Sequence, residues 1–406
     1  MRFFCMISFS VDKRIRGALG RAGRLITHHG VLETPAFVIV GTKATVKSVT
    51  MDEIKNLGGS IVLANTYHLY LQPGDEIVRN AGGLHTFMNW QGPTMTDSGG
   101  FQAFSLGSAY ARDFNKFISR GELEAFVRGE IPKQTRNPLA TIKEEGVLFR
   151  SHIDGSTHMF TPEKSISIQN NIGADIIFAF DECTSPTDSY EYQKGSMEKT
   201  HRWAKRSFEQ HKNSTTYEKQ GLFGIVQGGH YEDLRKESAK YIASIDFAGF
   251  GIGGSYTKED MEDVLRWVNP ILPEEKPRHL LGIGEPLQLF MGVEQGVDTF
   301  DCVAPTREAR NGALYTRDGR INIWNAKYKT DYTRIEENCD CQTCASYTRA
   351  YIAHLFRAKE LLGYTLATIH NLYFFTTLMK DIRIAIMNET FFEFRDLFTS
   401  RYYCKI

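Results

Sequence analysis

Residues 221–254, GLFGIVQGGHYEDLRKESAKYIASIDFAGFGIGG, decide the fold because they predict a strand, a helix and a second strand in succession. The apolar runs GLFGIVQGG and FAGFGIGG each end in glycines, and the segment YEDLRKESAKYIASI between them reads as a helix. Strands that are apolar almost throughout and separated by amphipathic helices are typical of a parallel sheet covered on both faces.

This unit recurs along the chain. Eight apolar runs end in a turn or a polar group: PAFVIVGT (35–42), SIVLANTYH (60–68), TMTDSGG (94–100), DIIFAFDEC (175–183), GLFGIVQGG (221–229), FAGFGIGG (247–254), HLLGIGEP (279–286) and TFDCVAPT (299–306). They predict an α/β protein of the (β/α)8 TIM-barrel type, whose active site lies at the carboxyl ends of the strands. A doubly wound open sheet is the alternative, but no G-x-G-x-x-G follows the first strand, as a dinucleotide-binding fold would require.

Two segments interrupt the pattern. Residues 106–143 fit no strand–helix unit, and we expect them to be a surface insertion without a catalytic part. The following FRSHIDGSTHMFT looks like a hairpin. We therefore expect a catalytic barrel over 1–335, and over 336–406 a zinc-binding subdomain with C-terminal helices packed on the barrel.

Charge and cysteine usage limit the function classes. Lys plus Arg and Asp plus Glu each number 48, so only a local basic patch could hold a polyanion. No apolar run approaches the roughly 20 residues that span a bilayer, and the start MRFFCMISFS reads as a strand rather than a signal peptide. Three of the seven cysteines are clustered and four are scattered, which is no disulfide framework and favours a reducing cytoplasm.

The clustered cysteines predict a metal site. Cys339, Cys341 and Cys344 form C-x-C-x2-C, and His370 follows on a helical segment. Three thiolates and one imidazole make a closed tetrahedral zinc site, which is structural because no position is left for water. The alternative is three coincidentally close cysteines with His370 as an ordinary helix residue.

Two aspartates sit where apolar runs break into turns: Asp97 in TMTDSGGFQ and Asp301 in TFDCVAPTR. Carboxylates at the ends of buried strands are held rigidly and are partly desolvated. A pair of them can supply the nucleophile and the acid/base of a double displacement at a sugar carbon. The alternative is that either aspartate caps a helix or binds a turn amide.

Seven motifs in order carry a family resemblance: DSGGFQ, SHIDGS, FDEC, VQGG, GIGG, DCVAPTR with RNG following, and CDCQTC with a later histidine. Together they resemble the tRNA-guanine transglycosylases, also called queuine tRNA-ribosyltransferases, from about residue 8 to the C-terminus apart from the insertion. The resemblance implies a barrel with a zinc subdomain. It also implies an enzyme that replaces guanine at the wobble position of tRNAs of the Asp, Asn, His and Tyr type with a 7-deazaguanine base.

The resemblance also assigns roles to residues. Asp301 would be the nucleophile and Asp97 the general acid/base. Asp181 would read the ring N–H and amino groups of guanine, with Gln227 and the backbone N–H of Gly254 on the carbonyl side. The remaining pocket positions are Phe101 stacked on one face of the base, Leu281 near the other, and Ser98, Asn65 and His68 in supporting roles. For Phe101 and Leu281, plain core packing is the alternative.

A basic stretch beginning beside Asp301 fits contacts to the anticodon loop, because sequence-specific RNA recognition targets unstacked loop bases. Its Lys and Arg residues are Arg307, Arg310, Arg317, Arg320, Lys327, Lys329 and Arg334. Only Arg307 and Arg310 match family positions near the anticodon. A solvated charged face is the alternative for the whole stretch.

One loop departs from the family. Gly254 is followed by SYTKEDM, which is shorter than the glycine-rich loop of many bacterial relatives. We hypothesise that the altered loop admits queuine itself rather than only its aminomethyl precursor, although Cys183 keeps the bacterial residue of FDEC. Separately, Tyr347, Tyr351 and His354 fall on one helical face that resembles a homodimer patch, with packing inside the subdomain as the alternative.

Three rival functions remain from the sequence. A non-catalytic tRNA-binding subunit would lack the acidic residues that this chain keeps at 97, 181 and 301. A glycosidase-like barrel would not need the guanine-reading residues or the zinc motif. Base exchange in DNA is the third, and the zinc motif with Arg307 and Arg310 favours tRNA instead.

Overall fold

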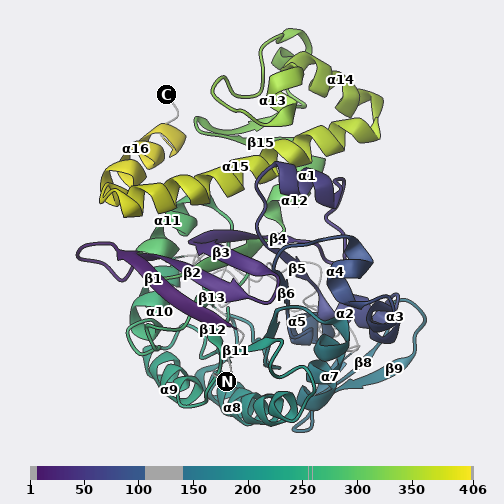
Figure 1. The fold of residues 1–406 in the computed structure, drawn as a ribbon, viewed down its shortest axis with the longest axis vertical. Helices are drawn as coiled ribbons and strands as arrows, with labels where there is room; N and C mark the ends of the chain where they lie inside the picture. The colour runs from purple at the N-terminus through teal and green to yellow at the C-terminus, as the bar shows by residue number, and fades with distance from the viewer. Residues whose placement is uncertain (1–6, 106–139, 255, 258, 404–406) are drawn as a thin grey trace.

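The computed structural model describes residues 7–105, 140–254, 256–257 and 259–403, and its centre is a closed barrel of parallel strands (Figure 1). The barrel strands are β4 (Ala36–Val40), β5 (Val62–Ala64), β6 (Thr94–Thr96), β10 (Ile176–Phe178), β11 (Gly221–Val226), β12 (Gly249–Ile252), β13 (Arg278–Leu280) and β14 (Thr299–Cys302). Each lies in one of the predicted apolar runs, except that β13 begins one residue earlier, at Arg278. Strand β10 pairs in parallel with β6, with Ile176 opposite Met95, and this pairing closes the barrel and excludes an open sheet.

Helices connect the strands and cover the outside of the barrel. They are α1 (Met51–Asn56), α2 (Thr66–Leu71), α3 (Asp75–Asn80), α4 (Gly83–Met88), α5 (Gly100–Ser105), α7 (Pro162–Ile172), α8 (Tyr190–Lys212), α9 (Glu232–Ala243), α10 (Met261–Val268), α11 (Pro286–Glu294) and α12 (Ala304–Arg310). Helix α8 begins at Tyr190, because the Ser189 side chain caps it by accepting from the Tyr192 N–H.

The N-terminal strands form a separate antiparallel sheet of β1 (Ser8–Arg14), β2 (Arg21–Thr27) and β3 (Gly30–Thr34). Leu25 and Leu32 from this sheet join the barrel-interior residues Val38 and Phe178 in one buried cluster. At the start of β14, Asp298 accepts from the buried Arg21 guanidinium at 2.9 and 2.7 Å. The sheet is therefore tied to the amino-terminal end of the barrel.

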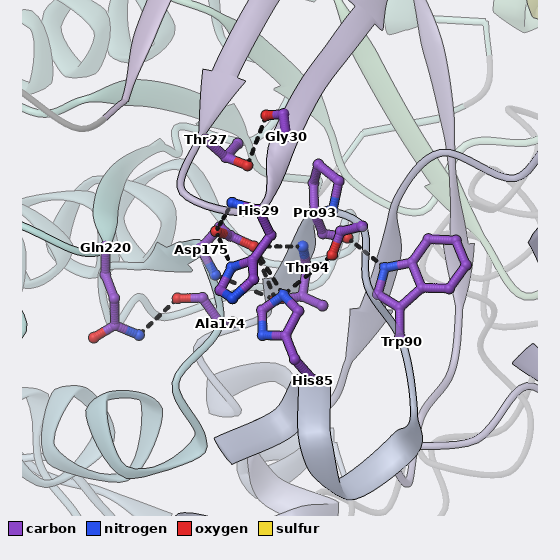
Figure 2. A network of polar contacts seen from close by, with 11 residues as sticks. Thr27, His29, Gly30, His85, Trp90, Pro93, Thr94, Ala174, Asp175 and Gln220 are labelled. Carbon is purple, nitrogen blue, oxygen red and sulfur yellow. Dashed lines mark hydrogen bonds and ion pairs between the residues drawn. The ribbon is translucent and has the colours of Figure 1, made fainter. Parts of the chain in front are cut away.

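A second acidic residue makes a similar tie at the start of β10 (Figure 2). Asp175 accepts from the Thr94 N–H at 2.8 Å and from the His29 N–H at 3.2 Å, and the imidazoles of His29 and His85 lie 2.8 and 3.2 Å from its two oxygens. His29 comes from the β2–β3 turn, and its ring stacks on that of His85. We call this group the Asp175 latch.

The predicted hairpin over FRSHIDGSTHMFT is confirmed. Strand β8 (Val147–Arg150) pairs in antiparallel fashion with β9 (Thr157–Phe160), and β7 (Ala140–Ile142) adds a third strand. The expected surface insertion over 106–143 falls outside the described residues as far as 139.

After the barrel, the chain forms a smaller unit with its own buried core. It contains β15 (Ala313–Thr316), β16 (Gly319–Asn322), a 3-10 helix (Ala326–Thr330), α13 (Gln342–Ser346) and α14 (Arg349–Ala358), followed by α15 (Leu361–Met387) and α16 (Phe391–Tyr403). The small core draws on residues from Ala309 to Ala367, on both sides of the boundary expected at 336. Helix α15 lies between this unit and the barrel (Figure 1), and its later residues, such as Phe375, belong to the main core.

Among the described residues, no helix combines the length and the apolar character needed to cross a membrane.

Candidate active site

Three carboxylates occupy the carboxyl ends of barrel strands. Asp97 follows β6, Asp181 follows β10 and Asp301 lies near the end of β14. Because the strands are parallel, these ends meet at one mouth of the barrel. The negative charges of Asp301 and Asp181 both act on Asp97 and contribute to raising its pKa, so the three groups share one electrostatic environment.

Asp97 is fixed by the loop that follows β5. Its Oδ1 accepts from the backbone N–H groups of Thr66 at 2.9 Å and Gly99 at 3.2 Å, and the Asn65 amide donates to Oδ2. Asn65 also caps α2, because its Oδ1 accepts from the His68 N–H at 2.9 Å. The carboxyl keeps some exposure, yet burial outweighs the N–H donors and, with Asp301 and Asp181, raises its pKa to about 7. Such a group exchanges protons readily near neutrality.

Asp181, Ser98 and Gln227 form a buried polar group. The Ser98 hydroxyl donates to Asp181 Oδ1 at 3.1 Å, and Gln227 Nε2 donates to Oδ2 at 2.7 Å. A Cβ at position 253 would lie 2.5 Å from Gln227 Nε2, so Gly253 leaves room for this amide. Gln227 Oε1 is buried without a hydrogen-bond partner among the described residues. Buried polar atoms are seldom left unpaired, and this oxygen keeps its acceptor capacity beside Asp181.

Asp301 is held from the neighbouring strand. Its Oδ1 accepts from the Gly282 N–H at 2.9 Å and lies 3.1 Å from Nε2 of the fully buried His279. The other imidazole nitrogen, Nδ1, lies 2.9 Å from the Thr299 hydroxyl. The side chain of Asp301 is 16% exposed, so the carboxylate is ordered but can be reached.

The ends of β11 and β12 are joined by a buried cation. The Arg235 guanidinium, from α9, donates to the carbonyls of Gly229 at 2.6 Å, Val226 at 3.1 Å and Gly253 at 3.0 Å. It also lies 5.2 Å from the ring centre of Tyr256 in the SYTKEDM loop, and burial lowers its pKa to about 10. Arg235 thus braces the backbone that presents Gln227.

The structure places the other predicted pocket residues around this mouth. The carbonyl of Gly254 accepts from the Cys183 thiol at 3.0 Å. Phe101 lies in α5 directly after the Asp97 turn, and Leu281 follows β13, both half-buried. His68 lies in α2, where burial, with Lys43, His152 and Lys47 nearby, lowers its pKa to about 4. Its imidazole is therefore neutral under physiological conditions.

The two predicted tRNA-contacting arginines lie on α12, immediately after Asp301. Arg307 is exposed, whereas Arg310 is half-buried and donates to the Thr306 carbonyl at 2.8 Å. Both cations therefore stand beside the mouth of the barrel, where Asp301 lies.

The Cys3His group is brought together as predicted. Nδ1 of His370 lies 3.8, 3.5 and 3.4 Å from the sulfurs of Cys339, Cys341 and Cys344, and all four residues are buried. His370 Nε2 donates to the Tyr315 carbonyl at 2.7 Å, which leaves Nδ1 free of a proton and facing the sulfurs. This donor set suits a closed structural metal site.

Sequence reasoning did not single out His279 or Arg235. The first opens the apolar run HLLGIGEP, and the second lies in a segment that reads as an amphipathic helix with a solvated face. A polar residue at the start of an apolar run was the available signal for His279. No local pattern distinguishes Arg235 from the exposed charges of α9, since its burial depends on the packing of α9 against β11.

Fold and site together define a (β/α)8-barrel protein with convergent acidic residues at its catalytic end and an appended Cys3His metal unit. The profile of the family described as Queuine tRNA-ribosyltransferase matches residues 16–131 and 128–404. Among curated relatives, the Queuine tRNA-ribosyltransferases of Thermoanaerobacter sp. (strain X514) and Pelotomaculum thermopropionicum are 50% and 48% identical, each over 98% of this chain and over 98% and 99% of their own lengths. That of Lactococcus lactis subsp. lactis is 49% identical over 98% of this chain and 96% of its own. The chain belongs to the queuine tRNA-ribosyltransferase family.

Proposed function

We propose that this enzyme exchanges guanine at the wobble position of tRNAs of the Asp, Asn, His and Tyr type for a 7-deazaguanine base, through a covalent enzyme–tRNA intermediate. The observation that carries the proposal is the convergence of Asp97, Asp181 and Asp301 at one barrel mouth, with distinct partners for each. A non-catalytic subunit would have no use for a carboxyl group whose pKa is raised to about 7.

In the first displacement, a carboxylate oxygen of Asp301 attacks C1′ of the wobble ribose. The C1′–N9 bond breaks, its electron pair moves to the purine, and Asp97 gives up its proton to the departing guanine. The products are an aspartyl ester at C1′, neutral guanine and the Asp97 carboxylate. Splitting the substitution into two steps lowers each barrier.

In the second displacement, the Asp97 carboxylate takes the N9 proton of the incoming base. N9 then attacks C1′, the ester C–O bond breaks, and Asp301 leaves as a carboxylate. Two inversions give overall retention. Asp97 ends protonated again, so the raised pKa serves both halves of the cycle.

Asp181 and Gln227 are the proposed base readers. A carboxylate accepts only, so Asp181 matches the ring N–H and amino group of guanine, a donor pattern that adenine does not present. Gln227 uses one amide N–H on Asp181. We assign its second N–H, with the Gly254 N–H, to the carbonyl of the base. Phe101 and Leu281 would cover its two faces.

The nucleophile assignment is tested by trapping. Wild-type enzyme mixed with tRNA and quenched in denaturant should give a protein–RNA adduct by mass spectrometry, and Asp301→Asn should give none. The amide keeps the size of the side chain but is a poor nucleophile. Asp154→Asn, at an exposed turn, is the matched control and should form adduct normally. An adduct that survives Asp301→Asn would show that another residue attacks.

The choice of incoming base is tested by competition. We propose that the SYTKEDM loop, anchored through Tyr256 on Arg235, leaves space for the cyclopentenediol of queuine. Unlabelled guanine, the aminomethyl precursor and queuine would each compete with labelled guanine for incorporation into tRNA. Queuine should compete at least as well as guanine. If queuine fails to compete while the precursor succeeds, the hypothesis of an opened pocket is wrong.

Four further assignments belong to the proposal. The metal at the Cys3His site would be one structural zinc per chain, since three thiolates and one imidazole are its preferred closed set. Arg307 and Arg310 would contact the anticodon loop. Tyr347 lies in extended backbone before helix α14, so the expectation that it shares one helical face with Tyr351 and His354 is wrong. Its ring nevertheless stacks on that of Tyr351, and this pair, with His354 further along α14, supports a homodimer surface. We place the enzyme in the cytoplasm because tRNA is its substrate.

A further inference from the structure

The imidazole of His279 lies next to the carboxylate of Asp301, the nucleophile assigned above. His279 lies on β13 and is fully buried, with Nε2 3.1 Å from Asp301 Oδ1 and Nδ1 2.9 Å from the Thr299 hydroxyl. The Phe178 ring, with its centre 5.4 Å away, packs against the imidazole. Contacts at both nitrogens and on the ring leave this side chain a single orientation.

Chemistry fixes which nitrogen bears hydrogen. A carboxylate has no proton to donate, so the short contact to Asp301 requires an N–H on Nε2. Nδ1 then accepts from the Thr299 hydroxyl when the ring is neutral. His279 is therefore a donor to Oδ1, alongside the Gly282 N–H.

A hydrogen-bond donor to Oδ1 stabilises the carboxylate form of Asp301 more than its ester form. Hydrogen bonds to an ionised acceptor are roughly twice as strong as those to a neutral one. In the free enzyme Oδ1 belongs to a carboxylate, whereas in the covalent intermediate the Asp301 group is a neutral ester. The bond from His279 thus strengthens as the ester breaks and charge returns to the aspartate.

We propose that His279 is a positioning residue that makes Asp301 a good leaving group in the second displacement, so that the covalent intermediate discharges quickly onto the incoming base. The inference rests on the proposed function, because it assumes that Asp301 forms the ester. His279 itself gains and loses no proton or electron pair: the C1′–O bond breaks, its electrons go to Asp301, and the N–H remains on Nε2 throughout.

The test measures discharge directly. Adduct is formed with tRNA and chased with guanine, and its decay is followed by denaturing gel. His279→Phe keeps a planar ring but removes the donor, and should slow discharge about tenfold and raise the standing adduct, with the KM for guanine unchanged. His279→Gln reaches a similar point with an amide N–H and should stay within about threefold of wild type.

Two results would overturn the inference: discharge by His279→Phe within twofold of wild type, or His279→Gln as slow as His279→Phe, which would indicate packing alone. If His279→Phe does not fold, Thr299→Val supplies the test, since it leaves His279 in place and frees its Nδ1. A discharge slowed about threefold supports the proposal, and an unchanged rate contradicts it. A wild-type enzyme that neither forms adduct nor exchanges guanine would instead refute the proposed function.

Discussion

At the scale of single residues, the site depends on giving chemically identical carboxyl groups different surroundings. Asp97 accepts from two backbone N–H groups and an amide but is buried near two other acids. Asp301 accepts from Gly282 and faces His279, and Asp181 faces a serine and a glutamine. In the proposed mechanism, these partners separate a proton carrier, a nucleophile and a base reader.

The raised pKa of Asp97 predicts the pH dependence of adduct formation. In the proposed mechanism the acid form of Asp97 donates the proton to departing guanine, and its fraction falls as pH rises through about 7. The single-turnover rate of adduct formation should therefore be highest below pH 7 and decrease about tenfold per pH unit above it. Rapid quench between pH 5.5 and 8.5 measures this. A rate that increases steadily to pH 8.5 would exclude Asp97 as the acid.

Functional residues at the ends of strands could be predicted from the sequence. Residues whose orientation or burial depends on packing between elements distant in the sequence could not. Asp97, Asp181 and Asp301 follow apolar runs, and the parallel arrangement of those runs requires their ends to meet. The orientation of Gln227 depends on Arg235 and Gly253, which come from two other elements. No pattern along the chain relates these three residues.

At the scale of elements, strands β10 and β14 each have two acidic residues. One directly precedes the strand, and the other lies at its catalytic end. Asp175 precedes β10 and Asp181 follows it, while Asp298 precedes β14 and Asp301 lies near its end. The first acid of each pair bonds to the N-terminal sheet or its turn. Polar residues at the amino end of a barrel serve stability, and those at the carboxyl end serve chemistry.

The Asp175 latch predicts a stability change without an activity change. Burial alone would raise the pKa of Asp175, but bonds from His85, His29 and the Thr94 N–H outweigh it and lower the pKa below its usual value. Its stabilisation is thus fully present above about pH 4 and is lost as pH falls through the lowered folded pKa. Asp175→Asn should cost about 2–4 kcal/mol at pH 7, because it leaves buried partners unmatched.

Urea unfolding at pH 7 and at low pH checks this prediction. The difference between wild type and Asp175→Asn should shrink at low pH, and guanine exchange by the folded variant should match wild type. Asp246→Asn is the matched control, because the side chain of Asp246 is 86% exposed and its ion pair with Lys276 contributes little. An Asp175→Asn protein as stable as the control would mean that the latch does not hold the sheet.

The strands themselves were the easiest elements to predict, since each buried run stands out from the polar helices around it. Their lengths were less predictable, since β6 and β10 keep only three residues each. Strand β6 ends before Asp97, whereas β10 ends before the apolar Ala179 and Phe180, where the Phe180 N–H donates to the Ser207 hydroxyl. The small core that reaches back to Ala309 could not be anticipated from a cysteine motif that starts at 339.

At the scale of the whole molecule, the metal site and the barrel are connected through shared structure. If the metal is the one zinc per chain proposed above, Cys341→Ser should reduce it from one equivalent to a small fraction and expose residues 309–367 to limited proteolysis, because the sulfurs belong to the small core. Cys183→Ser, outside that core, should keep its zinc. Elemental analysis with peptide mapping measures both. Full zinc content in Cys341→Ser would show that Cys341 is not a ligand.

Helix α15 makes these regions inseparable. His370 of this helix lies in the metal site, and the Asn371 amide donates to the carbonyls of Pro305 and Ala313. Further along the helix, the Phe375 ring packs against Phe37 of the barrel. Arg383 donates to Asp12 of the N-terminal sheet. A gene truncated before this helix would encode a barrel with an apolar stripe open to water. In evolution, the metal unit and the barrel must therefore be inherited, lost or recombined together, although each has a core of its own.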